Sequence, residues 1–230
     1  PIIGVDHLHA HIASCFLGKG RIEEMFPFIG VVVSGGHTSI YDCGGLDEFT
    51  VIGRTKDDAA GEAYDKVAKV LELGYPGGPV VEKRAREYNG REAIRFPRAF
   101  LRDRSDLDFS FSGLKTAVLY HWRDSRKTGE EKDKICFSFQ EAVIDVLDKK
   151  ISRAVRMRGA RTLAVGGGVI NNGELRRKLI SRAREERIEL YLPEEEYCGD
   201  NAAMVAFLGE GLFNAGLRSD LLLNAKTTGE

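Results

Sequence analysis

Two histidines in the stretch HLHAH, residues 7 to 11, are spaced for a shared metal ion. A helix brings positions i and i+4 onto one face about 5–6 Å apart, so His7 and His11 could reach one ion, whereas His9 would point away. Zinc proteases of the H-E-x-x-H type place a glutamate directly after the first histidine, because a metal-bound water needs a general base. Leu8 stands at that position, which argues against this class of protease.

A third potential ligand is Asp200, in the stretch CGDNAAM near the other end of the chain. It precedes a predicted helix, where an N-cap aspartate is the usual interpretation. If the fold brings it to His7 and His11, the three residues form a two-histidine, one-carboxylate site with open positions, suited to Fe(II) or Zn(II). Sequence spacing leaves both interpretations open.

Three glycine clusters could bind an anion: SGGHT at 34–38, PGG at 76–78 and GGG at 166–168. Glycine turns let backbone N–H groups converge, because no Cβ blocks the approach. Each cluster alone is most simply a tight turn. Two of them close predicted strands, and together the three favour a nucleotide held at the strand ends of an α/β sheet. Neither the P-loop pattern nor the dinucleotide pattern G-x-G-x-x-G is present.

The acidic stretch KDDAAGEAYDK lies in and around a helix start. Asp57 and Asp58 suit a helix N-terminus through its dipole. Asp65 lies within the helix, and that explanation does not cover it. A role in holding a ribose hydroxyl or the substrate and a role as a surface carboxylate are equal alternatives.

The elements that must position these residues alternate between strand and helix patterns, which indicates an α/β architecture with a largely parallel core sheet. The stretch FPFIGVVVSGGHTSIYDC, together with FTVIGRT, fits two or three strands joined by a glycine turn, and further strands are expected at 162–169 and 188–193. Residues 79–130 are mixed beyond a short initial helix. Helices are expected at 5–17, 61–73, 79–88, 131–158, 171–187 and 200–213.

Composition is that of an ordinary globular protein: 230 residues, 43% apolar and 30% charged, with a net charge of -1. No run of 18 apolar residues and no signal peptide is evident, so we expect a cytoplasmic protein with no membrane association. Widely spaced cysteines with no C-x-x-C pair suggest reduced thiols rather than a zinc ribbon or a disulfide framework. These are Cys15, Cys43, Cys136 and Cys198.

Basic residues concentrate between Lys83 and Arg104, although the net charge of the whole chain does not indicate a nucleic-acid partner. The simpler interpretation is a solvated face with internal ion pairs. The functional one is a phosphate-backbone patch interleaved with Tyr88, Phe96 and Phe100. The basic side chains are Lys83, Arg84, Arg86, Arg91, Arg95, Arg98, Arg102 and Arg104, against the acids Glu87, Glu92 and Asp103.

Taken together, these stretches resemble the bacterial TsaD branch of the tRNA threonylcarbamoyltransferase family, formerly labelled glycoprotease or O-sialoglycoprotein endopeptidase. The strings are long and unlike general-purpose motifs, and they run over nearly the whole chain. They are H-x-x-x-H at 7–11, FPFIGVVVSGGHT at 26–38, DDAAGEAYDKVAK at 57–69, YPGGP at 75–79, LDFSFSGLKT at 107–116, GGGVINN at 166–172 and CGDNAAM at 198–204.

The resemblance implies an α/β, actin/Hsp70-like ATPase (ASKHA) fold, of which this chain would be mainly the C-terminal lobe with the first lobe largely missing. Residues 1–25 would then be the metal-binding helix and the link from that lobe. Residues 26–230 would be the C-terminal lobe, with an inserted segment at about 79–130.

The implied activity is transfer of a threonylcarbamoyl group from threonylcarbamoyl-adenylate to N6 of adenosine-37, in tRNAs that read ANN codons. The implied cofactors are one divalent metal, Fe2+ or Zn2+, and an adenine nucleotide: threonylcarbamoyl-AMP, ATP or AMP. The implied partners are tRNA, a TsaB-like paralogue, a TsaE-like ATPase and an upstream threonylcarbamoyl-AMP synthase.

Carried over by motif, the metal ligands would be His7, His11 and Asp200. The general base is unassigned, with His37 a weak candidate and an ordinary turn residue the equal alternative. Substrate and nucleotide would contact Val32, Val33, Ser34, Gly35, Gly36, Asp65, Gly78 and Asn172. Gly173 departs from the basic residue that usually follows the asparagine of this motif.

Two alternatives stay open. One is a metal-dependent glycoprotease, which the older label invites and Leu8 opposes. The other is a non-catalytic nucleotide-binding scaffold, because the chain would lack the first lobe.

Overall fold

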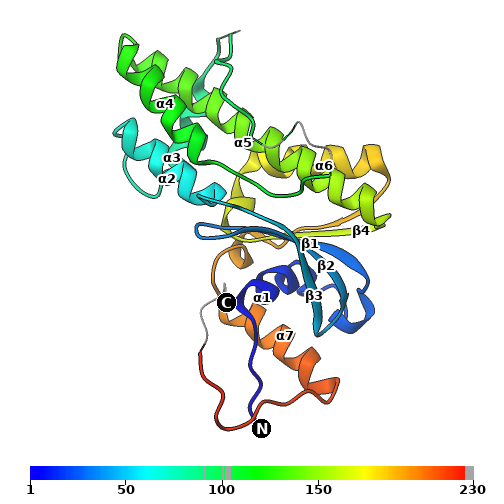
Figure 1. Ribbon diagram of the computed structural model, residues 1–230. Helices are drawn as coiled ribbons and strands as arrows, with labels where there is room; N and C mark the ends of the chain where they lie inside the picture. Colours follow the sequence, from blue (N-terminus) through cyan, green and yellow to red (C-terminus); the bar gives the residue numbers. More distant parts are fainter. Residues whose placement is uncertain (91, 100, 102–104, 226–230) are drawn as a thin grey trace.

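The computed structural model describes residues 1–90, 92–99, 101 and 105–225. After the first helix, three consecutive strands are followed by four α-helices, and strands and α-helices alternate from there on (Figure 1). The strands are β1 (Phe28–Val33), β2 (Thr38–Gly45), β3 (Glu48–Arg54), β4 (Thr162–Gly166) and β5 (Glu189–Tyr191). The α-helices are α1 (His7–Ala13), α2 (Ala60–Val70), α3 (Gly77–Glu87), α4 (Ser112–Asp124), α5 (Gly129–Arg158), α6 (Gly173–Glu186) and α7 (Ala202–Asn214). Short 3₁₀-helices are η1 (Ser14–Phe16), η2 (Ile22–Glu24), η3 (Gly168–Asn171) and η4 (Glu195–Tyr197).

The strands form one mixed sheet in the order β3-β2-β1-β4-β5. β2 runs antiparallel to its two neighbours, β1 and β3, whereas β4 runs parallel to both β1 and β5. The expectation of a largely parallel sheet is therefore wrong for the first half. The chain reverses its direction within a short turn at residues 34–37, where the Ser34 amide donates to the His37 carbonyl over 2.8 Å. A turn this short permits a hairpin, while a parallel crossover needs a dozen or so residues.

The sheet separates two groups of helices. Figure 1 shows α2 to α6 on one side of it, and α1 with α7 on the other. Side chains of β1 alternate between the two sides, as the pleat requires: Val31 and Val33 join the first core, while Phe28 and Val32 join the second. Both faces of β1 are thus buried, which explains its unbroken apolar run.

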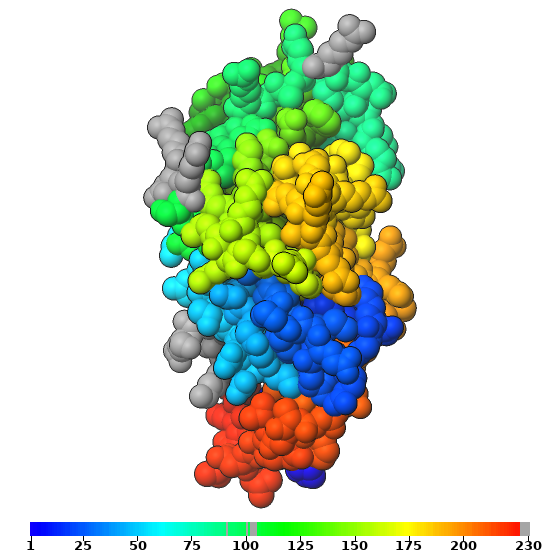
Figure 2. Space-filling view, turned by 90° about the vertical axis from the view of Figure 1, so that its right-hand side faces the viewer, coloured from blue at the N-terminus to red at the C-terminus, as the bar shows by residue number. Residues whose placement is uncertain are grey.

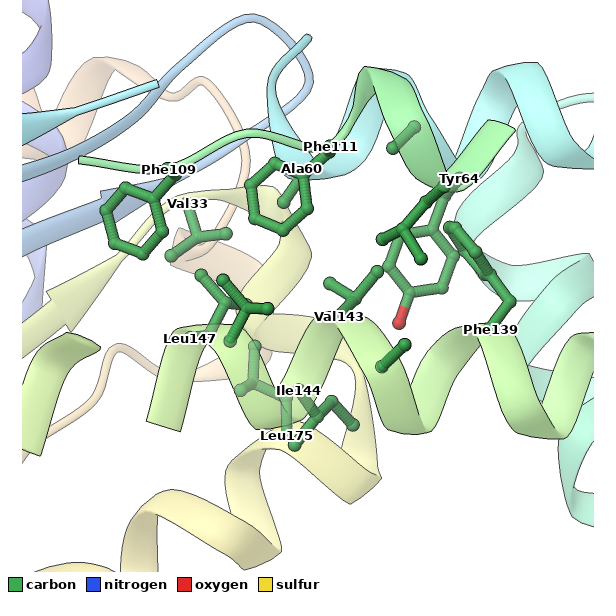
Figure 3. Packing of buried hydrophobic residues seen from close by; sticks show 14 of the residues in the cluster. Val33, Ala60, Tyr64, Phe109, Phe111, Phe139, Val143, Ile144, Leu147 and Leu175 are labelled. Atoms are coloured by element: carbon green, nitrogen blue, oxygen red, sulfur yellow. The ribbon is translucent and has the colours of Figure 1, made fainter. Parts of the chain in front are cut away.

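The larger core centres on α5, a helix of 30 residues. Its apolar stripe packs against α2, the sheet and the segment before α4 (Figure 3). Tyr64 of α2 meets Phe139 of α5 edge to face at 5.0 Å between ring centroids. α5 begins after the N-cap Thr128, whose hydroxyl accepts from the Glu131 amide, and ends at Gly159, which has φ 61°. The helix predicted over 131–158 is confirmed.

Helix α4 lies within the stretch that sequence patterns left unassigned. Its first turn is capped from outside the helix, because Asp57 accepts hydrogen bonds from the amides of Phe111 at 2.8 Å and Ser112 at 3.2 Å. The same carboxylate accepts from the hydroxyls of Ser110 and Ser112 at 2.5 and 2.7 Å.

The helix predicted over 5–17 is shorter than expected, with α1 followed directly by η1.

The molecule is elongated, with α7 and the segment after it at one end and α4 at the other (Figures 1 and 2). In the described ranges, no helix is both long and apolar enough to cross a membrane. The four cysteines are buried and unpaired, as expected for reduced thiols.

Candidate functional site

The structure brings His7, His11 and Asp200 together at one end of α1. Their ligand atoms lie within 4.8 Å of one another. The Nε2 atoms of His7 and His11 lie 3.3 and 3.0 Å from the same oxygen, Oδ1 of Asp200. Asp6 caps α1 by accepting from the Leu8 and His9 amides, and it thereby starts the helix at the first histidine. The predicted convergence of the three residues is therefore present.

The environment of this triad suits a metal. The His11 side chain is 3% exposed, whereas Asp200 is 79% exposed, so the site opens on one side only. Burial, then the neighbouring His7, lower the pKa of His11 despite the opposing influence of Asp200. The lowered pKa favours the neutral imidazole, which is the form that binds a metal. Its Nδ1 is buried and has no hydrogen-bond partner among the described residues. The other ring nitrogen, Nε2, contacts the carboxylate of Asp200.

The intervening residues of α1 serve packing. His9 stacks on Phe49 at 4.1 Å between ring centroids and lies apart from the triad, as predicted. Burial lowers the pKa of His9 against the influence of Asp6. Leu8 is buried in the second core, so the position that carries the catalytic glutamate in zinc proteases holds an apolar packing residue.

A cavity of about 380 Å³ gathers residues from four separate segments. Gly35 follows β1 and Gly168 follows β4, so the carboxyl ends of two parallel strands form one side, as in other open α/β sheets. Helices α2 and α3 form the other side. The predicted residues Gly35, Asp65, Gly78 and Asn172 all line this cavity, together with Gly61, Tyr64, Pro79, Glu82, Gly168, Val169 and Asn171.

Three of the lining glycines leave room for a bound group. A Cβ on Gly35, Gly78 or Gly168 would meet no atom within 4 Å, so protein packing does not require glycine at these positions. By contrast, a Cβ on Gly61 would lie 2.7 Å from the Ser34 carbonyl oxygen, and one on Gly77 would lie 2.5 Å from the Asp65 Cα. The latter two glycines let α2 and α3 approach their neighbours. The first three keep the cavity open.

Three polar residues are among those that line the same cavity. The Tyr64 hydroxyl is buried and has no partner among the described residues. Asp65 Oδ1 accepts from the Gly77 amide over 2.7 Å and so caps α3. Asn172 caps α6 by accepting from the Leu175 amide, and its Nδ2 donates to Gln140 over 2.7 Å. Asp65 and Asn172 therefore have structural roles in addition to lining the cavity.

The residues predicted along the turn after β1 divide into two kinds. The side chains of Val32 and Val33 are fully buried in opposite cores, so these two can reach a ligand through the backbone alone. Gly35 and Gly36 are exposed, and the Ser34 hydroxyl accepts from the His37 amide at 3.1 Å. After burial and His7, the charge of His37 also contributes to the lowered pKa of His11.

Sequence reasoning missed Tyr64 and Glu82. Glu82 lies one helical turn after Gly78 on α3, and that spacing was the available signal. Its Oε1 accepts from the Gly173 amide over 2.9 Å, at the N-terminus of α6. Glu82 also borders a second cavity of about 660 Å³ between α3, α5 and α6. The two cavities adjoin at this side chain.

The basic stretch is mostly ion-paired where the structure describes it. Arg84 pairs with Asp133, Arg86 with Glu82, and Arg98 with Asp145 and Glu141. Phe96 is buried, so its predicted place in an open patch is wrong, while Tyr88 is half-buried and packs on Phe137. Lys83 and Arg95 are exposed. Arg91, Phe100, Arg102, Asp103 and Arg104 lie outside the described residues.

Comparison with known sequences points to one family. The family model described as "TsaD: tRNA N6-adenosine threonylcarbamoyltransferase" matches residues 1–207. A relative of that name from Syntrophus aciditrophicus is 46% identical over 227 residues, which cover 98% of this chain and 65% of the relative. One from Clostridium beijerinckii is 46% identical over 228 residues, which cover 98% of this chain and 66% of the relative. The chain thus spans about two thirds of the length of these relatives.

Solved structures agree on the fold. Full-length HypF in its phosphate- and nucleotide-bound form superposes with a TM-score of 0.68 at 16% identity, covering 94% of this chain and 43% of HypF. The activator of 2-hydroxyisocaproyl-CoA dehydratase from Clostridium difficile, with bound ADPNP, reaches a TM-score of 0.50 at 16% identity. That match covers 94% of this chain and 70% of the activator. At such identities the likeness shows the fold alone, and it is consistent with the expected actin/Hsp70-like architecture.

Proposed function

The chain belongs to the tRNA N6-adenosine threonylcarbamoyltransferase family, and on that premise we propose that it takes part in threonylcarbamoyl transfer to tRNA. The donor is threonylcarbamoyl-adenylate, and the acceptor is N6 of adenosine-37 in tRNAs that read ANN codons. The observation that carries the proposal is the cavity bordered by Gly35, Gly78 and Gly168, at the sheet edge where α1 presents the metal-type triad.

In this proposal the cavity holds the adenylate. The backbone of Ser34, Gly35 and Gly36 faces the phosphate, because glycine amides approach an anion without obstruction. Asp65 has a carboxylate that can accept from a ribose hydroxyl, and the unpartnered Tyr64 hydroxyl gains a hydrogen-bond partner. Gly78 and Asn172 complete the wall. The same cavity would take ATP or AMP.

His7, His11 and Asp200 would hold one divalent ion, Fe2+ or Zn2+. Two imidazoles and one carboxylate, open on the exposed side of Asp200, are a donor set suited to either. The bound ion supplies Lewis acidity toward an oxygen of the donor. The chain itself contributes the α1 scaffold, which fixes the two imidazoles one helical turn apart.

The transfer step needs positioning more than covalent catalysis, because the donor is an activated mixed anhydride of a carbamate and AMP. The N6 amine attacks the carbamate carbonyl carbon and forms a new C–N bond. The C–O bond to the phosphate breaks, and AMP leaves with the electron pair, while the amine loses a proton. His37 is a candidate to accept that proton, and the turn amides stabilise the charge that develops on the leaving phosphate.

The proposed partners follow from the same assignment. They are tRNA as substrate, a TsaB-like paralogue, a TsaE-like ATPase and a synthase that makes the adenylate donor. We place the protein in the cytoplasm, where tRNA and these partners would be available. Lys83 and Arg95 are proposed as tRNA contacts, since both are exposed basic residues.

Two other functions compete with this one. A metal-dependent glycoprotease would use the triad, but buried Leu8 leaves it without the general base that follows the first histidine in such enzymes. A nucleotide-binding scaffold would use the cavity alone. The scaffold predicts nucleotide binding with no product, and the protease predicts cleavage of a glycoprotein by a highly purified sample.

The test is nucleoside mass spectrometry of tRNA incubated with the adenylate donor, the partner proteins and this chain extended to the length of its relatives. We expect threonylcarbamoyl-adenosine with the wild type and none with Asp200→Ala. Product from both proteins would overturn the role of the metal and keep the transfer. Absence of product from the wild type, with AMP still bound, would replace the transferase with the scaffold.

A further inference from the structure

One arginine joins the nucleotide cavity to the loop that carries the third metal ligand. Arg176 lies in the first turn of α6, immediately after the cavity turn (residues 168–172). Its Nε donates to the Ile170 carbonyl of that turn over 2.8 Å. Its Nη2 donates to the Pro193 carbonyl and contacts the Cys198 Sγ at 3.4 Å. Pro193 and Cys198 belong to the metal-ligand loop (residues 193–200), which ends at Asp200.

Few other polar contacts join these two segments. In the described part of the chain, the remaining hydrogen bond between them is from Asn171 Nδ2 to the Glu195 carbonyl, at 3.5 Å and therefore weak. Within the loop, Asn201 donates to the carbonyls of Tyr197 and Gly199 at 3.2 and 2.9 Å, so the final turn is internally braced. Arg176 is thus the main polar connection between a braced loop and the cavity wall.

The geometry requires a guanidinium. Its donors form a rigid fork, so one side chain can hold carbonyls on two different segments at a fixed separation. A lysine presents its donors at a single point, and a glutamine is shorter. Asp200 itself is mostly exposed and has little packing to fix it, so its position depends on the loop behind it.

We propose that Arg176 is a positioning residue that holds Asp200 in register with the nucleotide cavity, so that one guanidinium sets the affinity of both sites. Loss of its contact with Ile170 loosens the cavity turn, which carries Gly168, Val169 and Asn171 into the cavity wall. Loss of its contacts with Pro193 and Cys198 loosens the loop that presents Asp200. The inference rests on the metal and nucleotide sites proposed above and does not depend on the transfer reaction.

The test measures binding at both sites in one set of variants. Co2+ is the metal probe, because its visible absorption reports the number and type of its ligands, and AMP is the nucleotide probe. In Arg176→Gln we expect about tenfold weaker Co2+ binding with an altered spectrum, as is typical when a residue that orients a ligand is removed. AMP should bind several-fold more weakly in the same variant. Arg176→Lys should lie between that variant and the wild type.

The matched control is Arg184→Gln, an exposed arginine of the same helix. It should leave both affinities within twofold of the wild type. Wild-type Co2+ affinity and spectrum in folded Arg176→Gln would overturn the inference and leave the transferase proposal intact. If Arg176→Gln fails to fold, folded Arg176→Lys with wild-type affinities would overturn it instead. A wild type that binds no Co2+ would overturn the metal site, and this inference with it.

Discussion

The proposed nucleotide cavity and the proposed metal triad lie at the same end of the sheet but are built in opposite ways. The cavity wall depends on side chains that are absent, since Gly35, Gly78 and Gly168 each leave open space where a Cβ would stand. The triad depends on side chains that are present, and two of the three have little packing around them, since His7 is 47% exposed and Asp200 is 79% exposed. Adding atoms should therefore damage the first site, and removing atoms should damage the second.

This contrast separates binding from stability. Neither an exposed ligand nor an open glycine contributes much to the free energy of unfolding, so substitutions at either site should act on binding. Substitutions at the buried neighbours of these residues should instead act on the free energy of unfolding. Each variant below therefore has a matched comparison variant, close in sequence or of the same residue type, that should not share its main effect.

The largest effect is expected from Asp200→Ala, which removes a ligand of the triad. Affinity for Zn2+ or Co2+ should fall by more than about 100-fold, beyond the loss typical of residues that merely orient a ligand. AMP affinity and the melting temperature should stay close to wild type, because the side chain is exposed. Metal titration followed by calorimetry checks the first point. Glu196→Ala, an exposed acid of the same loop, should change neither, and equal losses in both variants would contradict the triad.

Two adjacent glycines of α3 give the second effect. Gly78→Ala adds a methyl group in open space within the cavity, so AMP should bind about tenfold more weakly while the helix gains about 0.5 kcal/mol of stability. Gly77→Ala places a Cβ 2.5 Å from the Asp65 Cα and 2.6 Å from the Tyr64 carbonyl oxygen. We expect it to lose about 1–3 kcal/mol in urea denaturation. Unchanged AMP binding in Gly78→Ala would show that the nucleotide lies elsewhere.

The same contrast explains which site residues could be predicted from the sequence. The i, i+4 spacing of His7 and His11 is local and predicts a shared ligand, whereas Asp200 lies 189 residues from His11 and only the fold brings them together. The glycine clusters predicted part of the cavity wall, since Gly35, Gly78 and Gly168 line it. Tyr64 could not be predicted, because the sequence pattern of a buried tyrosine in an apolar helix stripe is the same as that of a core residue. Only the structure shows that its hydroxyl has no partner among the described residues.

Fold prediction failed where the determinants are distant in sequence. Helix α5 carries its own cap and apolar stripe, and it was predicted closely. Helix α4 takes its cap from Asp57, which is 55 residues before Ser112, so no local signal marks its start. Pairing of β1 with β2 depends on a tight turn, while pairing of β1 with β4 depends on a long crossover through α5. The alternation of strand and helix patterns in the sequence predicted only the parallel pairing of β1 with β4.

Asp57 gives a smaller effect, on stability. Burial raises its pKa, but hydrogen bonds from Ser110, Ser112 and Phe111 outweigh burial and hold the pKa below its usual value near 3.8. The carboxylate therefore contributes stability above that pH, and the contribution is lost as the pH falls through the folded-state pKa. Asp57→Asn should unfold about 1 kcal/mol more easily at pH 7, a figure kept low because the site is solvent-screened.

Urea denaturation from pH 8 to 3 checks this prediction. The stability difference between Asp57→Asn and the wild type should be constant from pH 8 to 5 and shrink below about pH 4. Asp47→Asn, an exposed aspartate in the β2–β3 turn, should show no such difference. AMP and Co2+ affinities should be unchanged in both variants. A loss of AMP affinity in Asp57→Asn would move the boundary of the nucleotide site to the start of α4.

The smallest effect is expected at the exposed basic residues Lys83 and Arg95. Exposed charges are well screened, so the double variant Lys83→Gln/Arg95→Gln should weaken tRNA binding by less than about fivefold at physiological salt. The dependence of affinity on salt should become shallower, because fewer counterions are released on binding. Arg84→Gln is the control, since Arg84 is already paired with Asp133 at 2.9 Å. An unchanged salt dependence in the double variant would remove these residues from the tRNA surface, while the cavity and the triad would stand, because neither includes them.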